Sequence, residues 1–529
     1  MNQTLALNHS SLSGVCCQEI GPASQKIFAG FWDQNYTFYT LGFVKKPLSR
    51  AGQSGSEVAD KNNVRTPKIT IMTFVRLLTP FEHLMLMDMR QSYPMCFFLE
   101  MRLAGPLHRQ QFAAAVLSAS ARHPQTQMRV GYCRGRPVWL APDQTPTVEW
   151  VDEATAAPAV LWRPIDLRRE SGVRFIVIAE PSHRWRVVLQ VHHSVCDGLA
   201  AVEYFGDLWA CYSAATPAAF RSPDRLARRA RAPTAPVAAG SHLTHESLAF
   251  ARFFPEKLAR PGTTTAAAHS SLSNPLRTPY ETFEFSSAIS LALRNAASRA
   301  SVTLNDVVIA AVMQALLAWN AAAGHPSKRI RVNMPVSLRS PGTRGPACND
   351  MGYAFLDRTS DDCTSFCRLT LSIATASRWI QANRAAEWFL DTLAVLSTRP
   401  WLLWLITRLP VCLSTAVVSN LGNITPRLRA RAHPPGHADP YAQPIADGKQ
   451  VPDQWNVAAD LQVTGMWAVP PVRPGTRAAV GVTTYGGRLH IAVLCDTKSL
   501  GHNATAALAL MIQDALQHAA DGSSAVTQH

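Results

Sequence analysis

The sequence of 529 residues contains no apolar run that reaches the roughly 18 residues needed to cross a membrane as a helix. Its first residues, MNQTLALNH, lack the basic start and the long apolar stretch of a secretory signal peptide. The 11 cysteines are spread along the chain, and neither close pair, Cys16-Cys17 or Cys363/Cys367, belongs to a four-ligand metal pattern. These absences predict a soluble, cytoplasmic protein with free thiols, no metal and no transmembrane segment.

Lysine and acidic residues are also scarce. Of 51 basic residues 9 are Lys and 42 are Arg, against 36 acidic residues, which gives a formal net charge of +15. The arginines are scattered and form no basic stripe interleaved with aromatic residues, so we expect no nucleic-acid partner. With 47% apolar and 16% charged residues, the chain is neither disordered nor collagen-like, and its length allows two domains or one large two-lobed enzyme.

The amino-terminal part differs in composition from the rest. Residues 1–71 include the polar stretch Ser49–Pro67, which has almost nothing to bury, and we expect a partly disordered leader. A translation start at Met72 would explain the same pattern, and the aromatic residues of Phe28–Phe43 leave a docking segment open. Residues 215–274 are rich in Ala, Pro, Arg, Ser and Thr and predict a low-complexity connector.

The connector separates two patterned blocks, an amino-terminal lobe at 72–214 and a carboxy-terminal lobe at 275–529. Apolar patterning predicts strands at Met95–Leu103, Val173–Ala179, Trp185–Val191, Ile330–Val336, Ala416–Asn420, Ala478–Tyr485 and Leu489–Cys495. Thr303 and Asp306 suggest a capped helix start. The Pro- and charge-rich segment Thr425–Asp453 predicts an inserted loop. The short run Trp401–Ile406 predicts a buried helix, and peripheral membrane contact is the alternative.

The segment Val188–Gly198 (VLQVHHSVCDG) is the most informative part of the sequence. It runs from a buried strand through His192 and His193 to an Asp-Gly turn that opens a helix. Because adjacent strand residues point to opposite faces, the two histidines are expected to have different roles. Asp197 is placed where a turn can bring its carboxylate back under the His193 imidazole. Gly198 allows a sharp turn and close approach of other atoms.

This His-His-x-x-x-Asp-Gly pattern in a strand–turn–helix context resembles the CoA-dependent acyltransferase superfamily. That superfamily includes chloramphenicol acetyltransferase, condensation domains, wax ester synthases, alcohol acetyltransferases and polyketide-associated acyltransferases. The likeness covers about residues 76–500. The weaker supporting segments are Arg76–Glu82 (RLLTPFE), Thr303–Val308 (TLNDVV), Arg331–Arg339 (RVNMPVSLR) with Asn349 and Gly352, and Ser419–Gly422 (SNLG).

The resemblance implies two chloramphenicol-acetyltransferase-like α/β lobes, each a mixed sheet flanked by helices, with a channel at their interface. It implies a free-standing acyltransferase of lipid or secondary metabolism that moves an acyl group to a hydroxyl or amine acceptor. The donor would be an acyl-CoA or acyl-carrier thioester, with no permanently bound cofactor, and a carrier-protein partner is left open. Acyl length and acceptor identity do not follow from the residues.

The resemblance also implies roles for single residues. His193 would be the general base that takes the acceptor's proton. His192, Asp197 and Gly198 would support the motif, with Asp197 paired to Arg339 of the second lobe. Substrate-binding residues are not identifiable.

Other interpretations of the same residues remain. A condensation-like scaffold that binds a ligand without turnover is the non-enzymatic alternative. His192 to Asp197 also spells the His-x4-Asp signature of glycerophosphate acyltransferases, with Phe254-Pro255-Glu256 resembling their second block. A zinc site from His192, His193 and Asp197 is disfavoured because neighbouring strand residues diverge. Cys196 is interpreted as a small apolar filler rather than a nucleophile.

Overall fold

The computed structural model describes residues 74–152, 161, 163–214, 259–263, 280–340, 345–409, 411–432, 455–458, 460–501 and 503–525. The predicted leader and nearly all of the predicted connector lie outside these residues. Residues 132–136 do not belong to the larger unit, residues 67–131 and 137–529, whose fold is described below.

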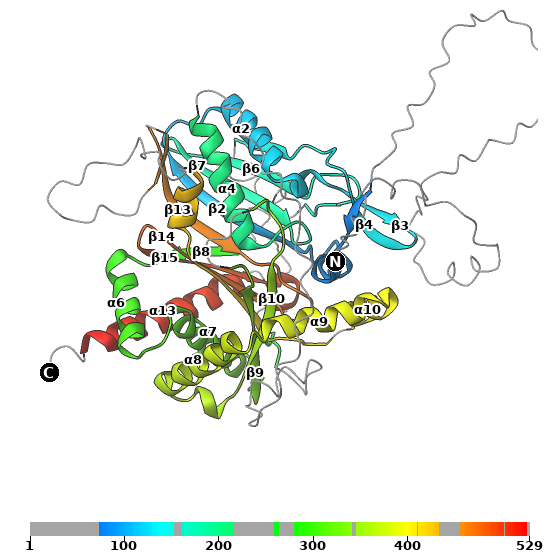
Figure 1. Cartoon of the computed structure of the whole chain (residues 1–529). Helices are drawn as coiled ribbons and strands as arrows, with labels where there is room; N and C mark the ends of the chain where they lie inside the picture. Colours follow the sequence, from blue (N-terminus) through cyan, green and yellow to red (C-terminus); the bar gives the residue numbers. More distant parts are fainter. Residues whose placement is uncertain are drawn as a thin grey trace, which may run out of the picture. The chain divides into compact units, whose positions relative to one another are not determined.

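The first lobe is built on a six-stranded mixed sheet in the order β12-β13-β2-β7-β6-β5 (Figure 1). Its strands are β2 (Cys96–Ala104), β5 (Thr147–Val151), β6 (Val173–Glu180), β7 (Arg184–His192), β12 (Asn456–Ala458) and β13 (Leu461–Val469). Strands β6 and β7 form the predicted hairpin. Short elements beside this sheet are β1 (Phe74–Leu77), β3 (Val130–Cys133), β4 (Arg136–Leu140) and the 3₁₀ turn Pro124–Gln127.

The sheet of the first lobe is buried on both faces. Leu99, Met101 and Leu189 belong to a core with helices α2 (Arg109–Arg122) and α4 (Gly198–Ser213). The alternate residues Phe98 and Val188 belong to a second core that reaches the other lobe's sheet. Because side chains alternate along a strand, covering both faces requires the near-continuous apolar runs seen in the sequence.

The second lobe has its own six-stranded mixed sheet in the order β10-β9-β11-β14-β15-β8. The strands are β8 (Tyr280–Glu284), β9 (Arg329–Ser337), β10 (Met351–Thr359), β11 (Ala416–Asn423), β14 (Ala478–Tyr485) and β15 (Arg488–Cys495). Helices α6 (Ser287–Arg299), α7 (Leu304–Ala322), α8 (Phe366–Ala382) and α13 (Ala504–Ala525) pack with it, and α12 (Thr497–Leu500) and the 3₁₀ turn Asp361–Cys363 are short connections. The capping box predicted at Thr303 and Asp306 is present.

Helix α7 is long and apolar enough to cross a membrane, and it is the single unbroken helix of this kind among the described residues. However, 67% of its most apolar window is buried inside the protein. Its residues Val308, Val312 and Leu316 belong to the core of the second lobe. Burial in this core accounts for the apolar character of α7.

Three expectations differ from the structure. Strands β12 and β13 follow residue 275, yet β13 pairs antiparallel with β2, so assigning every residue after 275 to the second lobe is wrong. The predicted loop at Thr425–Asp453 begins with helix α11 (Thr425–Ala432), which packs against α4, and residues 433–453 lie outside the described part. The predicted helix at Trp401–Ile406 is α10 (Pro400–Arg408), but only one side of it is buried.

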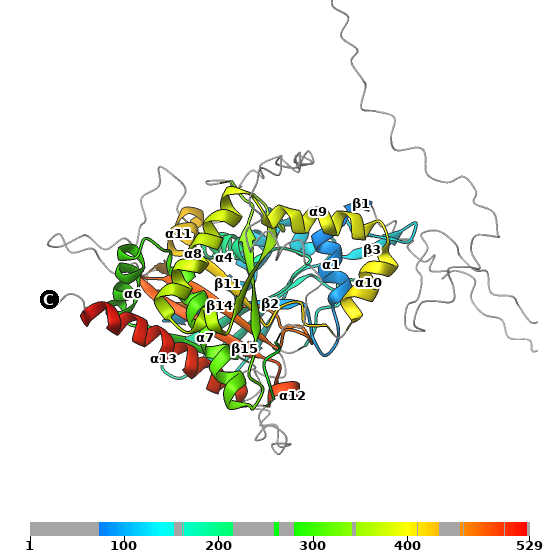
Figure 2. The ribbon, with the colours of Figure 1, turned by 90° about the horizontal axis from the view of Figure 1, so that it is seen from below.

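Helices α1 (Pro80–Asp88), α9 (Ala386–Ser397) and α10 form a separate group beside β10 (Figure 2). Phe81, Met85, Phe355, Phe389 and Leu403 form the apolar core that joins these elements. This group brings residues of both sequence blocks to one side of the motif that carries the two histidines.

Candidate active site

The strand–turn–helix segment fixes the position of His193. Strand β7 ends at His192, and the His193 backbone N–H then donates to the Met95 carbonyl at 2.8 Å. Asp197 is the N-cap of α4, where its Oδ1 accepts from the Ala200 N–H at 3.0 Å. A capping carboxylate satisfies one of the backbone donors that a helix start leaves unpaired. The histidine is therefore held between the end of a central strand and the first turn of a helix.

The His193 ring faces a cavity and is packed between aromatic side chains. Its centroid lies 5.7 Å from that of Phe81 and 5.0 Å from that of Phe97, both in edge-to-face geometry. Burial lowers the pKa of His193, although its own carbonyl, Asp197 and Asn349 oppose the shift. A neutral imidazole near pH 7 can accept a proton, as a general base must.

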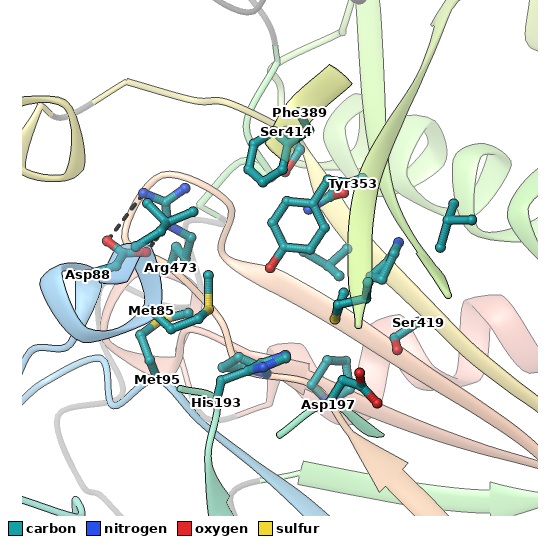
Figure 3. A pocket seen from close by; sticks show the side chains of 18 of the residues that line it. Met85, Asp88, Met95, His193, Asp197, Tyr353, Phe389, Ser414, Ser419 and Arg473 are labelled. Atoms are coloured by element: carbon teal, nitrogen blue, oxygen red, sulfur yellow. Dashed lines mark hydrogen bonds and ion pairs between the residues drawn. The ribbon is translucent and has the colours of Figure 1, made fainter. Parts of the chain in front are cut away.

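Asp197 does not share a hydrogen bond with His193. Its Oδ2 accepts from Arg339 Nη1 at 2.6 Å and from the Asp350 N–H at 2.8 Å. The ion pair predicted from the resemblance is thus present, and both side chains are less than a tenth exposed. Burial disfavours the charged form of Arg339, but the neighbouring Asp197 carboxylate favours it, and the pKa of Arg339 is raised. Figure 3 shows the Asp197 carboxylate directed away from the His193 ring, which indicates a structural role.

His192 has different surroundings from its neighbour, as strand alternation predicts. It is buried, its Nδ1 accepts from the Ser194 N–H at 3.2 Å, and burial lowers its pKa to about 3. Burial likewise raises the pKa of the Cys196 thiol well above its usual value, in keeping with an apolar filler. The His-x4-Asp interpretation needs His192 to act with Asp197, whose oxygens are occupied by other partners. Its second block, residues 254–256, lies outside the described residues.

Gly198 meets a spatial rather than a conformational requirement. It is the first residue of α4, so the sharp turn expected there is made by Asp197, the extended N-cap. A Cβ at Gly198 would lie 2.8 Å from a Leu421 side-chain carbon, which is closer than packed atoms approach. The glycine thus lets β11 of the second lobe approach the motif helix.

The segment Arg76–Glu82 contacts the turn that carries His193 and Ser194. Glu82 is fully buried and accepts from Arg76 at 2.7 and 2.8 Å, from Trp139 at 3.1 Å and from Gln125 at 3.0 Å. The Ser194 hydroxyl donates to the Glu82 carbonyl at 2.9 Å. A Thr-Pro-x-Glu capping box at the start of α1 is the sequence signal for this arrangement.

Asn349 braces the turn from the second lobe. Its Nδ2 donates to the carbonyls of His193 at 2.9 Å and Ser194 at 3.0 Å. Its Oδ1 and the His193 Nδ1 are buried without a hydrogen bond of good geometry, although the amide is close enough to raise the histidine pKa. Asn349 therefore holds the backbone that carries the histidine ring.

The cavity above His193 is mainly apolar. Its apolar lining includes Met95, just before β2, and residues of α1, β10, α9 and α10: Leu84, Met85, Met351, Phe389, Leu393, Leu396, Leu403 and Ile406. The polar lining includes Tyr353, Ser414, Ser419, Asn420 and the ion pair Asp88–Arg473 (Figure 3). Sequence analysis missed Asp88 and Arg473, because no local pattern joins residues 385 positions apart.

Comparisons with known proteins identify the fold. No protein-family model matches the sequence. An uncharacterized protein of Mycobacterium tuberculosis is 23% identical over 435 residues, which cover 79% of this chain and 94% of that protein. Polyketide synthase associated protein 5 from the same species superposes with a TM-score of 0.54 at 14% identity, covering 85% of this chain and 99% of its own.

Nonribosomal peptide synthetase domains are similar as well. The first condensation domain of the CDA synthetase matches with a TM-score of 0.53 at 17% identity, covering 84% of this chain and 97% of its own. The epimerization domain from the third module of tyrocidine synthetase B matches at 0.52 and 13% identity, covering 86% and 98%. The chain therefore has the two-lobed fold of condensation domains and of polyketide synthase associated protein 5.

Proposed function

We propose that this protein is a free-standing acyltransferase that moves an acyl group from a CoA or carrier-protein thioester to a hydroxyl or amine acceptor. The observation that carries the proposal is the buried imidazole of His193 in the lining of a mainly apolar cavity within a condensation-domain fold. Burial lowers the pKa of this ring, which favours its neutral form. Such a ring can take a proton without first losing one of its own at pH 7. The cytoplasmic location predicted from the sequence belongs to this proposal.

The chemistry needs one base and no covalent enzyme intermediate. His193 takes the proton from the acceptor O–H or N–H while the acceptor atom bonds to the thioester carbonyl carbon. The resulting oxyanion collapses, the C–S bond breaks, and the imidazolium returns the proton to the departing thiolate. The reaction balances: the reactants are the acyl thioester and the acceptor, and the products are the ester or amide and the free thiol.

The apolar lining of the cavity suggests the class of group it accepts. Leu393, Leu403 and Met85 present hydrocarbon and thioether surface, which favours an aliphatic or aromatic acyl chain or acceptor by burial of apolar area. The Asp88–Arg473 pair within the same lining offers a polar contact away from the histidine.

The test is incubation of the purified protein with a panel of acyl-CoA thioesters and alcohol or amine acceptors, read by mass spectrometry of the products. His193→Gln keeps the volume of the ring approximately and should lower kcat by roughly 10²–10⁴-fold. His108→Gln, on the surface of the first lobe, is the matched control and should leave turnover unchanged. Unchanged turnover in His193→Gln would disprove the base assignment. Tight thioester binding without any product would favour the non-catalytic scaffold.

A further inference from the structure

The outer face of α9 and α10 carries an unusual concentration of exposed apolar side chains. Of the fourteen large apolar side chains that are exposed in the described part of the chain, seven fall between Trp388 and Val411. We call six of these the apolar ridge: Val395, Trp401, Trp404, Leu405, Leu409 and Val411. Val395 is 70% exposed and Trp401 is 63% exposed, so no segment that the structure describes covers either side chain. Exposed apolar side chains concentrated in one segment of the chain are typical of an interaction site.

Helix α10 is apolar on both sides. Leu403 and Ile406 point inward and line the cavity, while Trp401, Trp404 and Leu405 lie on the outward side at helical spacing. A surface helix of a water-soluble protein normally carries polar residues on its outward side. The outward side of α10 therefore has the composition of a buried surface, although the described part of the chain leaves it exposed.

The charge of the segment favours an anionic lipid surface as its partner. Residues 395–412 contain Arg399 and Arg408 and no acidic residue. The Arg408 guanidinium lies 5.9 Å from the centre of the Trp404 ring, and Arg399 is exposed in the turn between the helices. Tryptophan, leucine and arginine on one face are typical of helices that lie in the interface of a bilayer.

The geometry of the helix pair fits the same partner. Together α9 and α10 are apolar enough for a membrane span, but they are bent by 118° at their junction. A straight crossing of the bilayer is incompatible with that bend, whereas shallow insertion of one face is not. Figures 1 and 2 show α10 at the end of the α9–α10 pair, beside α1.

We propose that the apolar ridge docks this protein onto the surface of an anionic lipid bilayer. The inward sides of the same two helices line the His193 cavity, so docking places one wall of that cavity at the lipid surface. Binding to lipid does not require turnover, and its test is independent of the acyl-transfer proposal.

The test measures co-sedimentation of the full-length protein with two kinds of vesicle, phosphatidylcholine alone and phosphatidylcholine mixed with an equal part of phosphatidylglycerol. We expect binding to the mixed vesicles that weakens at high salt. Trp401→Ser/Trp404→Ser should lower the vesicle partition coefficient by at least about tenfold, because the two rings are the largest side chains of the apolar ridge. Arg399→Gln/Arg408→Gln should remove the preference for the mixed vesicles.

The matched control carries the same kind of change on another face. Leu291→Ser/Leu510→Ser replaces two exposed leucines of α6 and α13, and it should bind vesicles as the unaltered protein does. Melting temperatures of the tryptophan and leucine variants should agree with that of the unaltered protein, since the replaced side chains are exposed. Absence of vesicle binding overturns the proposal, as does equal loss in the control. Binding that survives Trp401→Ser/Trp404→Ser, or a change in oligomeric state without vesicle binding, overturns it too, the latter in favour of a second copy as the occupant.

Discussion

Replacing Asp197 with Asn keeps the size of the side chain but removes one buried charge and one hydrogen-bond acceptor. Asn is as good an N-cap as Asp, so its side-chain oxygen can still accept from the Ala200 N–H. What is lost is the charge and the acceptor Oδ2, because an amide N–H₂ group takes its place and faces two donors, Arg339 Nη1 and the Asp350 N–H. The Asp197 and Arg339 side chains are 4% and 9% exposed, so Arg339 would keep its charge in a site with little water.

The magnitude follows from that burial. Removing one partner of a buried ion pair costs about 3–5 kcal/mol, because the remaining charge is left without compensation. With a shift of roughly 2 °C per kcal/mol for a large domain, the melting temperature should fall by about 5–10 °C. Asp152→Asn is the control, since its pair with Arg109 is largely exposed and such pairs contribute about 0–1 kcal/mol.

The assay is thermal melting at pH 7 of Asp197→Asn, Arg339→Gln and the double variant. The double variant should cost less than the sum of the single variants, by about 0.5–3 kcal/mol of coupling. Asp197 also raises the pKa of His193, so Asp197→Asn should move the acid limb of kcat/KM to lower pH. Strictly additive losses, or a loss in Asp197→Asn no larger than in Asp152→Asn, would refute the reasoning.

Two further predictions concern the base and the cavity wall. Because burial lowers the pKa of His193 and the base must be neutral, kcat/KM should keep its plateau below the ordinary histidine value of about 6.5; a pH–rate profile with its acid midpoint above that value would contradict the assignment. Gly352→Ala should lower the melting temperature, because its Cβ would lie 2.1 Å from the Ala386 carbonyl oxygen and would force α9 from β10. Gly324→Ala is the control for a glycine with open space, although its positive φ of 74° adds a small strain of its own, and an equal loss in both would argue against the close contact.

Local patterns in the sequence determined the strand, turn and helix that position the site. Alternation along a strand through both histidines predicted that they differ; β7 ends at His192, yet the structure places His192 in the core and His193, in the turn that follows, at the cavity. The capping box at Thr303 and the β6–β7 hairpin were predictable for the same reason, since both depend on residues close together in the chain. The pairing of Asp197 with Arg339 came from the resemblance to a family rather than from spacing.

Only the tertiary structure decided how distant segments combine. The pairing of β13 with β2 joins a late strand to the first sheet, and the Asp88–Arg473 pair joins residues 385 positions apart. Hydrophobic periodicity predicts that one side of a helix or strand is buried, but it does not predict which segment of the chain covers that side. For α10, hydrophobic periodicity could not predict which side is buried, because Trp401 and Leu403 are both apolar. Packing against α1 buries Leu403 and leaves Trp401 exposed.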